Sequence, residues 1–262
     1  MTQESPQTQV LLEAQVWRKL DFLEGHLHNL LRGEAALVPT QPGRDVQIVA
    51  QRELPPKKGF SSIEGQCRLL HDLASIELQA MELGVRSLIE YPEAPPKFRA
   101  ELAAVTLEEG KHLRLCLEAM EALGMPWGSF PAHNALWLCV SPEDSLLDRI
   151  VIVHRYLEGS GLDATTTILR RLIGIGEGAA ETFRAIKVIS EDEVAHVQFG
   201  SRWYHALVRE AGLDPAEDFR SRLVGLFSRI PRRSEPINED LRRLAGFTES
   251  EVTTLLDFRK RV

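Results

Sequence analysis

The chain has 262 residues and a formal net charge of −7, with 44% hydrophobic and 26% charged residues. This composition is that of a globular protein with a sizeable core, in one large domain or two small ones, and it excludes a disordered or fibrous chain. The negative charge disfavours binding of the whole chain to a polyanion, and three widely spaced cysteines indicate neither a disulfide framework nor a zinc knuckle. A polar N-terminus and the lack of a long apolar stretch predict a cytoplasmic protein without membrane contact.

Helical periodicity runs through most of the sequence and predicts an all-α fold. Residues 10–32 are expected to form an amphipathic helix, and the proline-rich residues 33–60 an extended arm. Four long helices are then expected at about residues 62–90, 96–123, 141–173 and 179–210. The third of them is predicted to start at Ser141-Pro-Glu-Asp144, where a serine cap, a proline at the first helical position and acids in the first turn agree. One or two short helices are expected after residue 210.

These elements predict three parts. Residues 1–60 would be the N-terminal helix and arm, residues 61–210 a ferritin-like four-helix bundle, and residues 211–262 a helical extension packed on that bundle. The bundle is inferred because the long helices form two hairpins of similar length, joined by one long crossover at residues 125–140.

Two Glu-x-x-His segments, Glu109–His112 and Glu193–His196, lie within predicted helices. Residues three apart share a helix face, so each segment places a carboxylate beside an imidazole on a face that is otherwise apolar. An ionised carboxylate at such a position is costly unless it is paired or bound to a metal. Because about one such segment is expected by chance in a chain this rich in Glu and His, the argument depends on what surrounds them.

Each segment has a glutamate one helix upstream. Glu77 and Glu109 are each 16 residues from Glu93, the centre of the first turn, and the midpoint of Glu158 and Glu193 falls in the glycine-rich turn at residues 174–178. Residues equally far from a tight turn lie opposite each other in an antiparallel helix pair. Four carboxylates and two imidazoles are the ligand set of a dinuclear iron or manganese site. The predicted metal ligands are therefore Glu77, Glu109, His112, Glu158, Glu193 and His196.

Glu82 is the competing candidate in the first long helix. It is only 11 residues before the centre of the turn, more than a helical turn out of register with Glu109. It also shares a polar helix face with His71, Gln79 and Arg86, which we interpret as a solvent face. Glu77 is therefore preferred, and replacement of Glu82 is predicted to leave the metal content unchanged.

Three further residues are predicted to lie around the ligands without binding metal. Metal-bound histidines usually donate their second ring N–H to a carboxylate, a role open to Glu108 and Asp192, although plain surface acids would look the same in the sequence. His154 lies one turn before Glu158 and is expected to form a hydrogen bond near the metals, with a ligand role as the alternative.

Gly159 and Gly161 indicate either a local helix distortion beside Glu158 or close helix packing, since each costs about 1 kcal/mol in a helix relative to Ala.

With these motifs in place, the chain resembles the ferritin-like superfamily of di-iron carboxylate proteins. More narrowly, it is similar to the uncharacterised bacterial family known as domain of unknown function 455. The stretches that carry the resemblance are residues 70–80, 108–112, 130–137, 157–163 and 192–197, with a later match at 236–238 and 245–247. The resemblance implies a ferritin-like fold with a dinuclear site at the six ligands named above. Three positions depart from the family pattern: Ser75, where histidine is common, and the pair Gly159-Ser160, where Ala-Arg is common.

The ligand set and the resemblance together predict a metal-dependent oxidoreductase or hydroxylase. It would hold two Fe ions, or Mn, or a mixed Mn/Fe pair, react with oxygen or peroxide, and act on a small organic substrate with electrons from a donor protein. A monomer or small homo-oligomer is expected. Nucleic acid is disfavoured as a partner, with modified tRNA left open because more distant relatives act on it. An iron-binding or ferroxidase-type storage protein and a metal-free helical scaffold are the alternatives.

Overall fold

The computed structural model describes residues 9–233 and 235–260. In these residues the secondary structure is helical, apart from one isolated β-bridge between Ile48 and Ala132, so the prediction of an all-α fold is confirmed. The α-helices are α1 (Val16–Leu31), α2 (Ile63–Glu90), α3 (Pro96–Ala122), α4 (Leu146–Ile150), α5 (Glu158–Ile173), α6 (Ala180–Glu210), α7 (Pro215–Leu226), α8 (Glu239–Leu244) and α9 (Glu249–Lys260). A π-helical segment, Val151–Leu157, joins α4 to α5, and short 3-10 helices span Gln51–Glu53, Trp137–Cys139 and Gly176–Ala179.

The chain divides into two compact units. The first contains residues 1–58 and 67–134, and the second contains residues 59–66 and 135–262. The division therefore passes through the first turn of α2 and through the middle of the crossover. The domain boundaries predicted after residues 60 and 210 stay a prediction.

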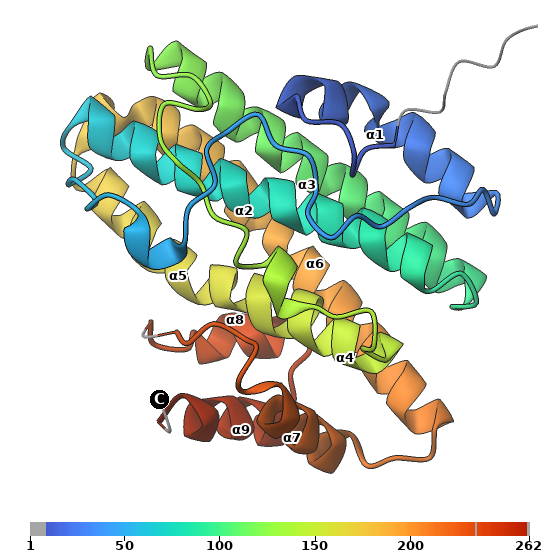
Figure 1. The fold of residues 1–262 in the computed structure, drawn as a ribbon. Helices are drawn as coiled ribbons and strands as arrows, with labels where there is room; N and C mark the ends of the chain where they lie inside the picture. The colour runs from blue at the N-terminus through green and yellow to red at the C-terminus, as the bar shows by residue number, and fades with distance from the viewer. Residues whose placement is uncertain (1–8, 234, 261–262) are drawn as a thin grey trace, which may run out of the picture. The chain divides into compact units, whose positions relative to one another are not determined.

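In the first unit, α1, α2 and α3 lie side by side (Figure 1). The helices approach closely where a glycine removes a side chain, because a Cβ on Gly110 of α3 would lie 2.6 Å from Cδ2 of Leu23 on α1. Arg99 joins the helix ends by donating hydrogen bonds to the carbonyl oxygens of Leu88 and Leu30, at 2.7 and 2.8 Å. These contacts satisfy carbonyls that a helix end leaves without intrahelical partners.

The polar face of α2 is buried, so its interpretation as a solvent face was wrong. Glu82, His71 and Gln79 are all 0% exposed. Segments distant in sequence cover them: Lys19 of α1 places Nζ 2.6 Å from Glu82, and Arg44 of the N-terminal arm binds both oxygens of the same carboxylate. The helical period shows which residues share a face, but it does not show that another segment brings compensating charge to it.

Two helices begin later than the sequence predicted. The first begins at Val16 instead of residue 10, and the carbonyl of Val10 accepts a hydrogen bond from Lys19 Nζ at 3.0 Å. The helix expected from Ser141 begins at Leu146, where Ser145 accepts a hydrogen bond from the backbone N–H of Asp148. The earlier cap-like sequence forms a turn of its own, in which the backbone N–H of Ser141 donates to the Asp144 carboxylate at 2.8 Å. Arg229 binds the same carboxylate at 2.7 Å.

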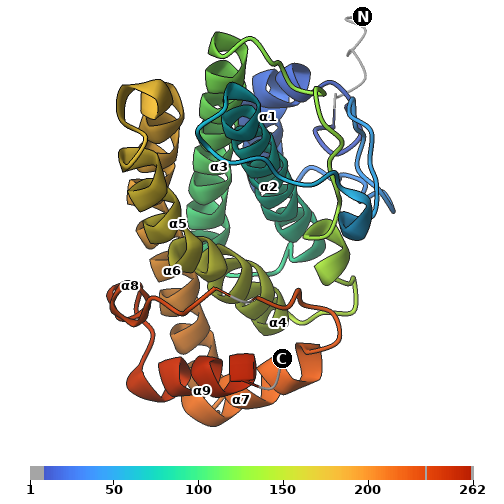
Figure 2. The same cartoon turned by 90° about the vertical axis from the view of Figure 1, so that its left-hand side faces the viewer.

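In the second unit, α4, the π-helical segment and α5 form one continuous helical stretch, which α6 follows after the glycine-rich turn (Figure 2). Gly176 has a φ of +74° in that turn, a conformation that favours glycine. After residue 210 the described residues form three helices, α7, α8 and α9, where the sequence predicted one or two. Of the helices in the described part of the chain, none combines the length and apolarity required to span a membrane.

Candidate metal centre

The first unit places three of the predicted ligands together. Glu77 projects from α2, and Glu109 and His112 project from consecutive turns of α3; all three are buried. Nδ1 of His112 lies 3.7 Å from Oε2 of Glu77 and 3.9 Å from Oε2 of Glu109. Glu77 and Glu109 are equally many residues from the turn at residues 91–95, and Glu77 therefore lies beside the Glu-x-x-His segment of the neighbouring helix.

The electrostatics of this group are those of acids that lack solvent. Burial raises the pKa of the Glu77 carboxyl, the neighbouring His112 opposes that shift, and the negative charge of Glu109 adds to it. Burial and a nearby like charge both disfavour a second ionised carboxylate, so a cation at this position would relieve the cost. The thiol of Cys116 belongs to the same environment, since burial and the charge of Glu77 raise its pKa well above the ordinary value.

In the second unit, Glu158 begins α5 directly after the π-helical segment. Its Oε1 lies 2.8 Å from Nδ1 of His154, a hydrogen bond in which the imidazole N–H donates to the carboxylate. The other oxygen, Oε2, is buried and has no hydrogen-bond partner in the described residues. A buried acceptor of this kind fits a bound cation or a polar ligand.

Glu193 and His196 lie on α6, are buried, and are 3.8 Å apart between Oε1 and Nδ1. One turn further along, Gly200 lets α6 approach the π-helical segment, because a Cβ there would lie 2.5 Å from the Cβ of His154. Phe199 packs edge-on against the His154 ring, with the ring centroids 5.0 Å apart. The histidine that holds Glu158 is therefore itself fixed by α6.

The helix distortion that Gly159 and Gly161 suggested is present as the π-helical segment, which ends at the residue before Glu158. The two glycines differ in their surroundings. A Cβ at Gly159 would collide with the guanidinium of Arg242, whereas nothing lies within 4 Å of a Cβ at Gly161. Close packing therefore explains the first glycine only.

Glu109, His112, Glu193 and His196 form a buried group that could hold metal ions. Each offers one ligand atom, and these atoms all lie within 4.8 Å of one another. Carboxylate and imidazole are ligands for several first-row transition metals, so the group does not by itself identify the ion.

The comparisons with known proteins agree with the motifs. The family described as "Protein of unknown function (DUF455)" matches residues 2–253. The chain belongs to this family. It is also 32% identical to an uncharacterized protein of Haemophilus influenzae over 213 residues, which cover 78% of this chain and 72% of that protein. No solved structure was found that matches the chain.

The residues predicted around the ligands have different environments in this family member. His154 contacts Glu158 as described, Glu108 is half-buried, and Asp192 is exposed. The roles of Glu108 and Asp192 in orienting histidines stay a prediction. His133 of the crossover offers its backbone carbonyl to Gln79 Nε2 at 2.9 Å, a contact that holds the loop against α2.

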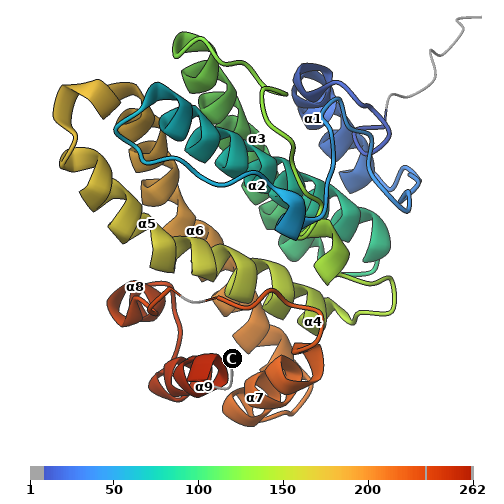
Figure 3. The same cartoon turned by 60° about the vertical axis from the view of Figure 1, so that its left-hand side comes forward.

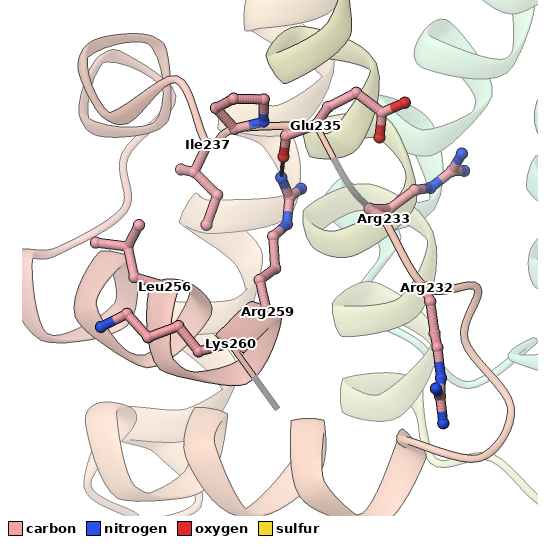
Figure 4. Close-up of a pocket in the computed structure, with 8 residues that line it drawn as sticks. Arg232, Arg233, Glu235, Ile237, Leu256, Arg259 and Lys260 are labelled. Atoms are coloured by element: carbon pink, nitrogen blue, oxygen red, sulfur yellow. Dashed lines mark hydrogen bonds between the residues drawn. The ribbon is translucent and has the colours of Figure 1, made fainter. Parts of the chain in front are cut away.

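The basic residues near the C-terminus line a cavity of about 470 Å³ between the loop before α8 and α9 (Figure 4). Its lining contains Arg232, Arg233, Arg259 and Lys260 together with apolar residues. Their charged groups diverge in Figure 4 and do not converge on one point. Arg259 binds Asp163 at 2.6 Å and Lys260 pairs with Asp257 at 3.1 Å, so part of this charge is already balanced within the chain.

Proposed function

We propose that the chain is a dinuclear iron or manganese protein with a ferritin-like bundle, and that it catalyses the oxygen- or peroxide-dependent oxidation of an organic substrate. The observation that carries the proposal is the buried group of Glu109, His112, Glu193 and His196. Glu77 and Glu158 would complete the ligand set, each from the helix that precedes a Glu-x-x-His helix.

The distances within each ligand pair support this assignment. The separations of 3.7 to 3.9 Å between Nδ1 and carboxylate oxygens are too long for hydrogen bonds. Two ligands bound at about 2.1 Å, as imidazole and carboxylate bind zinc, lie at most about 4.2 Å apart. Atoms at these separations can therefore share one ion after small side-chain movements. The buried Oε2 of Glu158 is a further acceptor that an ion would satisfy.

The donor types favour iron or manganese. A site made only of oxygen ligands would suit calcium or magnesium, whereas imidazole with carboxylate suits iron and similar ions. Cys116 is a nearby buried thiol, but it is not among the four residues that form the buried group able to hold metal ions. The proposed site therefore contains four carboxylates and two imidazoles without sulfur.

When bound, two such ions supply a redox centre at which oxygen or peroxide can be activated. The chain's own contribution is to neutralise their charge with carboxylates, to orient Glu158 through His154, and to keep water away. Leu113 follows His112, Val197 follows His196, and both are 0% exposed, so apolar side chains adjoin the ligands. A dry, apolar environment limits side reactions of reactive oxygen species and admits an organic substrate.

Metal analysis of the purified protein, combined with gel filtration, tests this function. We expect two Fe or Mn ions per chain on a monomer or small oligomer. Glu109→Ala and His196→Ala should each remove metal, whereas Glu118→Ala, on the exposed side of α3, should not. A shell-sized particle would instead support iron storage, and a wild-type protein without metal would support a scaffold. Retention of two tightly bound ions in both ligand variants would exclude the assignment.

A further inference from the structure

The C-terminal helices insert a buried arginine beside the end of the π-helical segment. Arg242 of α8 is 0% exposed, and α8 lies next to α5 (Figure 3). Its Nη1 donates a hydrogen bond to the carbonyl oxygen of Arg155 at 2.8 Å, while Nη2 and Nε donate to the carboxylate of Asp163 at 2.7 and 3.2 Å. Arg155 lies three residues before Glu158, and Asp163 five residues after it. One guanidinium thus binds a backbone carbonyl on one side of a proposed metal ligand and a side-chain carboxylate on the other.

The chain makes room for this guanidinium at the residue next to Glu158. A Cβ on Gly159 would collide with Nη1 of Arg242, so the planar group lies directly against the helix backbone. A π-helical turn interrupts the regular hydrogen bonds between residues four apart, and carbonyls near its end can bond to groups outside the helix. Arg155 shows this, since its carbonyl accepts a hydrogen bond from Arg242 of α8.

Asp163 anchors the C-terminal extension on α5. Besides the two bonds from Arg242, its carboxylate accepts one from Arg259 Nη2 at 2.6 Å and one from the backbone N–H of Asn238 at 2.9 Å. Arg259 also donates to the carbonyl of Glu235, a bond that is visible in Figure 4. Four donors from residues 238–259 therefore converge on one buried side chain of α5.

Arg155 makes the reciprocal contact, from the π-helical segment into the extension. It is fully buried, pairs with Glu251 of α9 at 2.8 Å, and lies over the Phe247 ring with its central carbon 4.2 Å from the centroid. Removing one partner of a buried ion pair is costly because it leaves the other charge uncompensated, so this pair ties the π-helical segment to α9. The extension and the π-helical segment hold each other in place.

We infer that Arg242 is a positioning residue, which fixes the π-helical segment and with it the direction of the Glu158 carboxylate towards the metals. The inference rests on the proposed function for the role of Glu158, but the contact of Arg242 with the π-helical segment does not depend on it. Arginine suits this position because its planar group binds a carboxylate through two N–H groups and offers a further N–H to a carbonyl.

The sequence supplies a matched control, since the next residue, Arg243, points to the surface and pairs with Glu239 and Glu249. We would compare Arg242→Gln and Arg243→Gln by hydrogen exchange of the metal-free proteins and by iron binding. Arg242→Gln should speed exchange at residues 151–159 at least tenfold, with less than twofold change in α1 and α3, and should weaken the binding of one of the two ions at least tenfold. Arg243→Gln should change each of these by less than twofold.

Loss of a buried arginine can unfold a protein, so Gly159→Ala is measured in parallel. It keeps every charge and displaces the guanidinium from the Arg155 carbonyl; we expect the same local increase in exchange. Unchanged exchange at residues 151–159 in Gly159→Ala, or in a folded Arg242→Gln protein, would overturn the inference, as would a uniform increase over all helices. A wild-type protein that binds neither iron nor manganese would defeat the proposed function alone, while the exchange measurements would still decide the role of Arg242 on the segment.

Discussion

Nδ1 of His154 lies 2.8 Å from Oε1 of Glu158, at the junction where the π-helical segment becomes an α-helix. The hydrogen bond occupies one carboxylate oxygen and leaves the other, Oε2, buried. It also engages the Nδ1 of His154, which agrees with a histidine that orients the carboxylate. The helix distortion, the histidine and the carboxylate therefore act as one unit.

Two glutamates of α2 should respond differently to the same substitution. Glu77→Gln is expected to lower the metal content, because it removes a charged ligand. Glu82→Gln is expected to leave the metal content unchanged and to lower the free energy of unfolding by about 3–5 kcal/mol, the usual cost of leaving buried cations, here Lys19 and Arg44, without their partner. Elemental analysis and urea unfolding measure the two effects. Loss of metal from a folded Glu82→Gln protein would show that the wrong glutamate was chosen.

Gly200 and Gly161 form a second contrasting pair. Gly200→Ala places a Cβ 2.5 Å from that of His154, so α6 or the π-helical segment must shift; we expect a loss of about 1–3 kcal/mol of stability, typical of overpacking. Gly161→Ala adds a methyl group where nothing lies within 4 Å, and should stabilise α5 by up to about 1 kcal/mol. Thermal unfolding of the two variants checks the prediction. Changes in stability of the same sign and size in both variants would contradict it.

His71 should make the protein sensitive to mild acid. Its ring is buried against Trp127, with centroids 4.5 Å apart, and burial lowers its pKa to about 4. Below pH 6.5 the unfolded chain takes up a proton at this position that the folded chain does not. The free energy of unfolding therefore decreases as the pH is lowered from 6.5 to about 4. The full effect is about 3 kcal/mol. Urea unfolding at pH 7 and pH 4.5 should show a smaller difference for His71→Phe than for the wild type.

Glu251 should make the stability of the protein depend on pH in a more acidic range than His71 does. Burial alone would raise its pKa, but hydrogen bonds from His205 and Arg155 outweigh that effect and lower it to about 2. The folded state then binds fewer protons than the unfolded state between pH 4.5 and pH 2, so about 3 kcal/mol of stability is lost as the pH falls through this window. Glu251→Gln should remove this dependence, while Asp257→Asn on the surface of α9 should retain it. Parallel stability curves for the wild type and Glu251→Gln would contradict the prediction.

The helices were largely predictable because their signals are local. Proline and glycine mark the ends of α2, α3, α5 and α6, and hydrophobic periodicity marks their buried faces. The same counting brought Glu77 to Glu109 and His112, since a short turn between straight helices leaves little freedom in register. The late start of the helix at Leu146 was missed because Asp144 finds its partner in Arg229, 85 residues further along the chain.

The sequence by itself therefore determined the all-helical class and the pairing of Glu77 with the first Glu-x-x-His segment, whereas it left open whether Gly159 and Gly161 mark a distortion or close packing. Only the tertiary structure decided which polar faces are buried. Lys19 and Arg44 enclose Glu82, and Arg242 and Asp163 join the last helices to α5, through contacts between residues 38 to 79 positions apart. Periodicity acts over a few helical turns, whereas the free energy of a buried charge depends on whichever partner the folded chain brings to it.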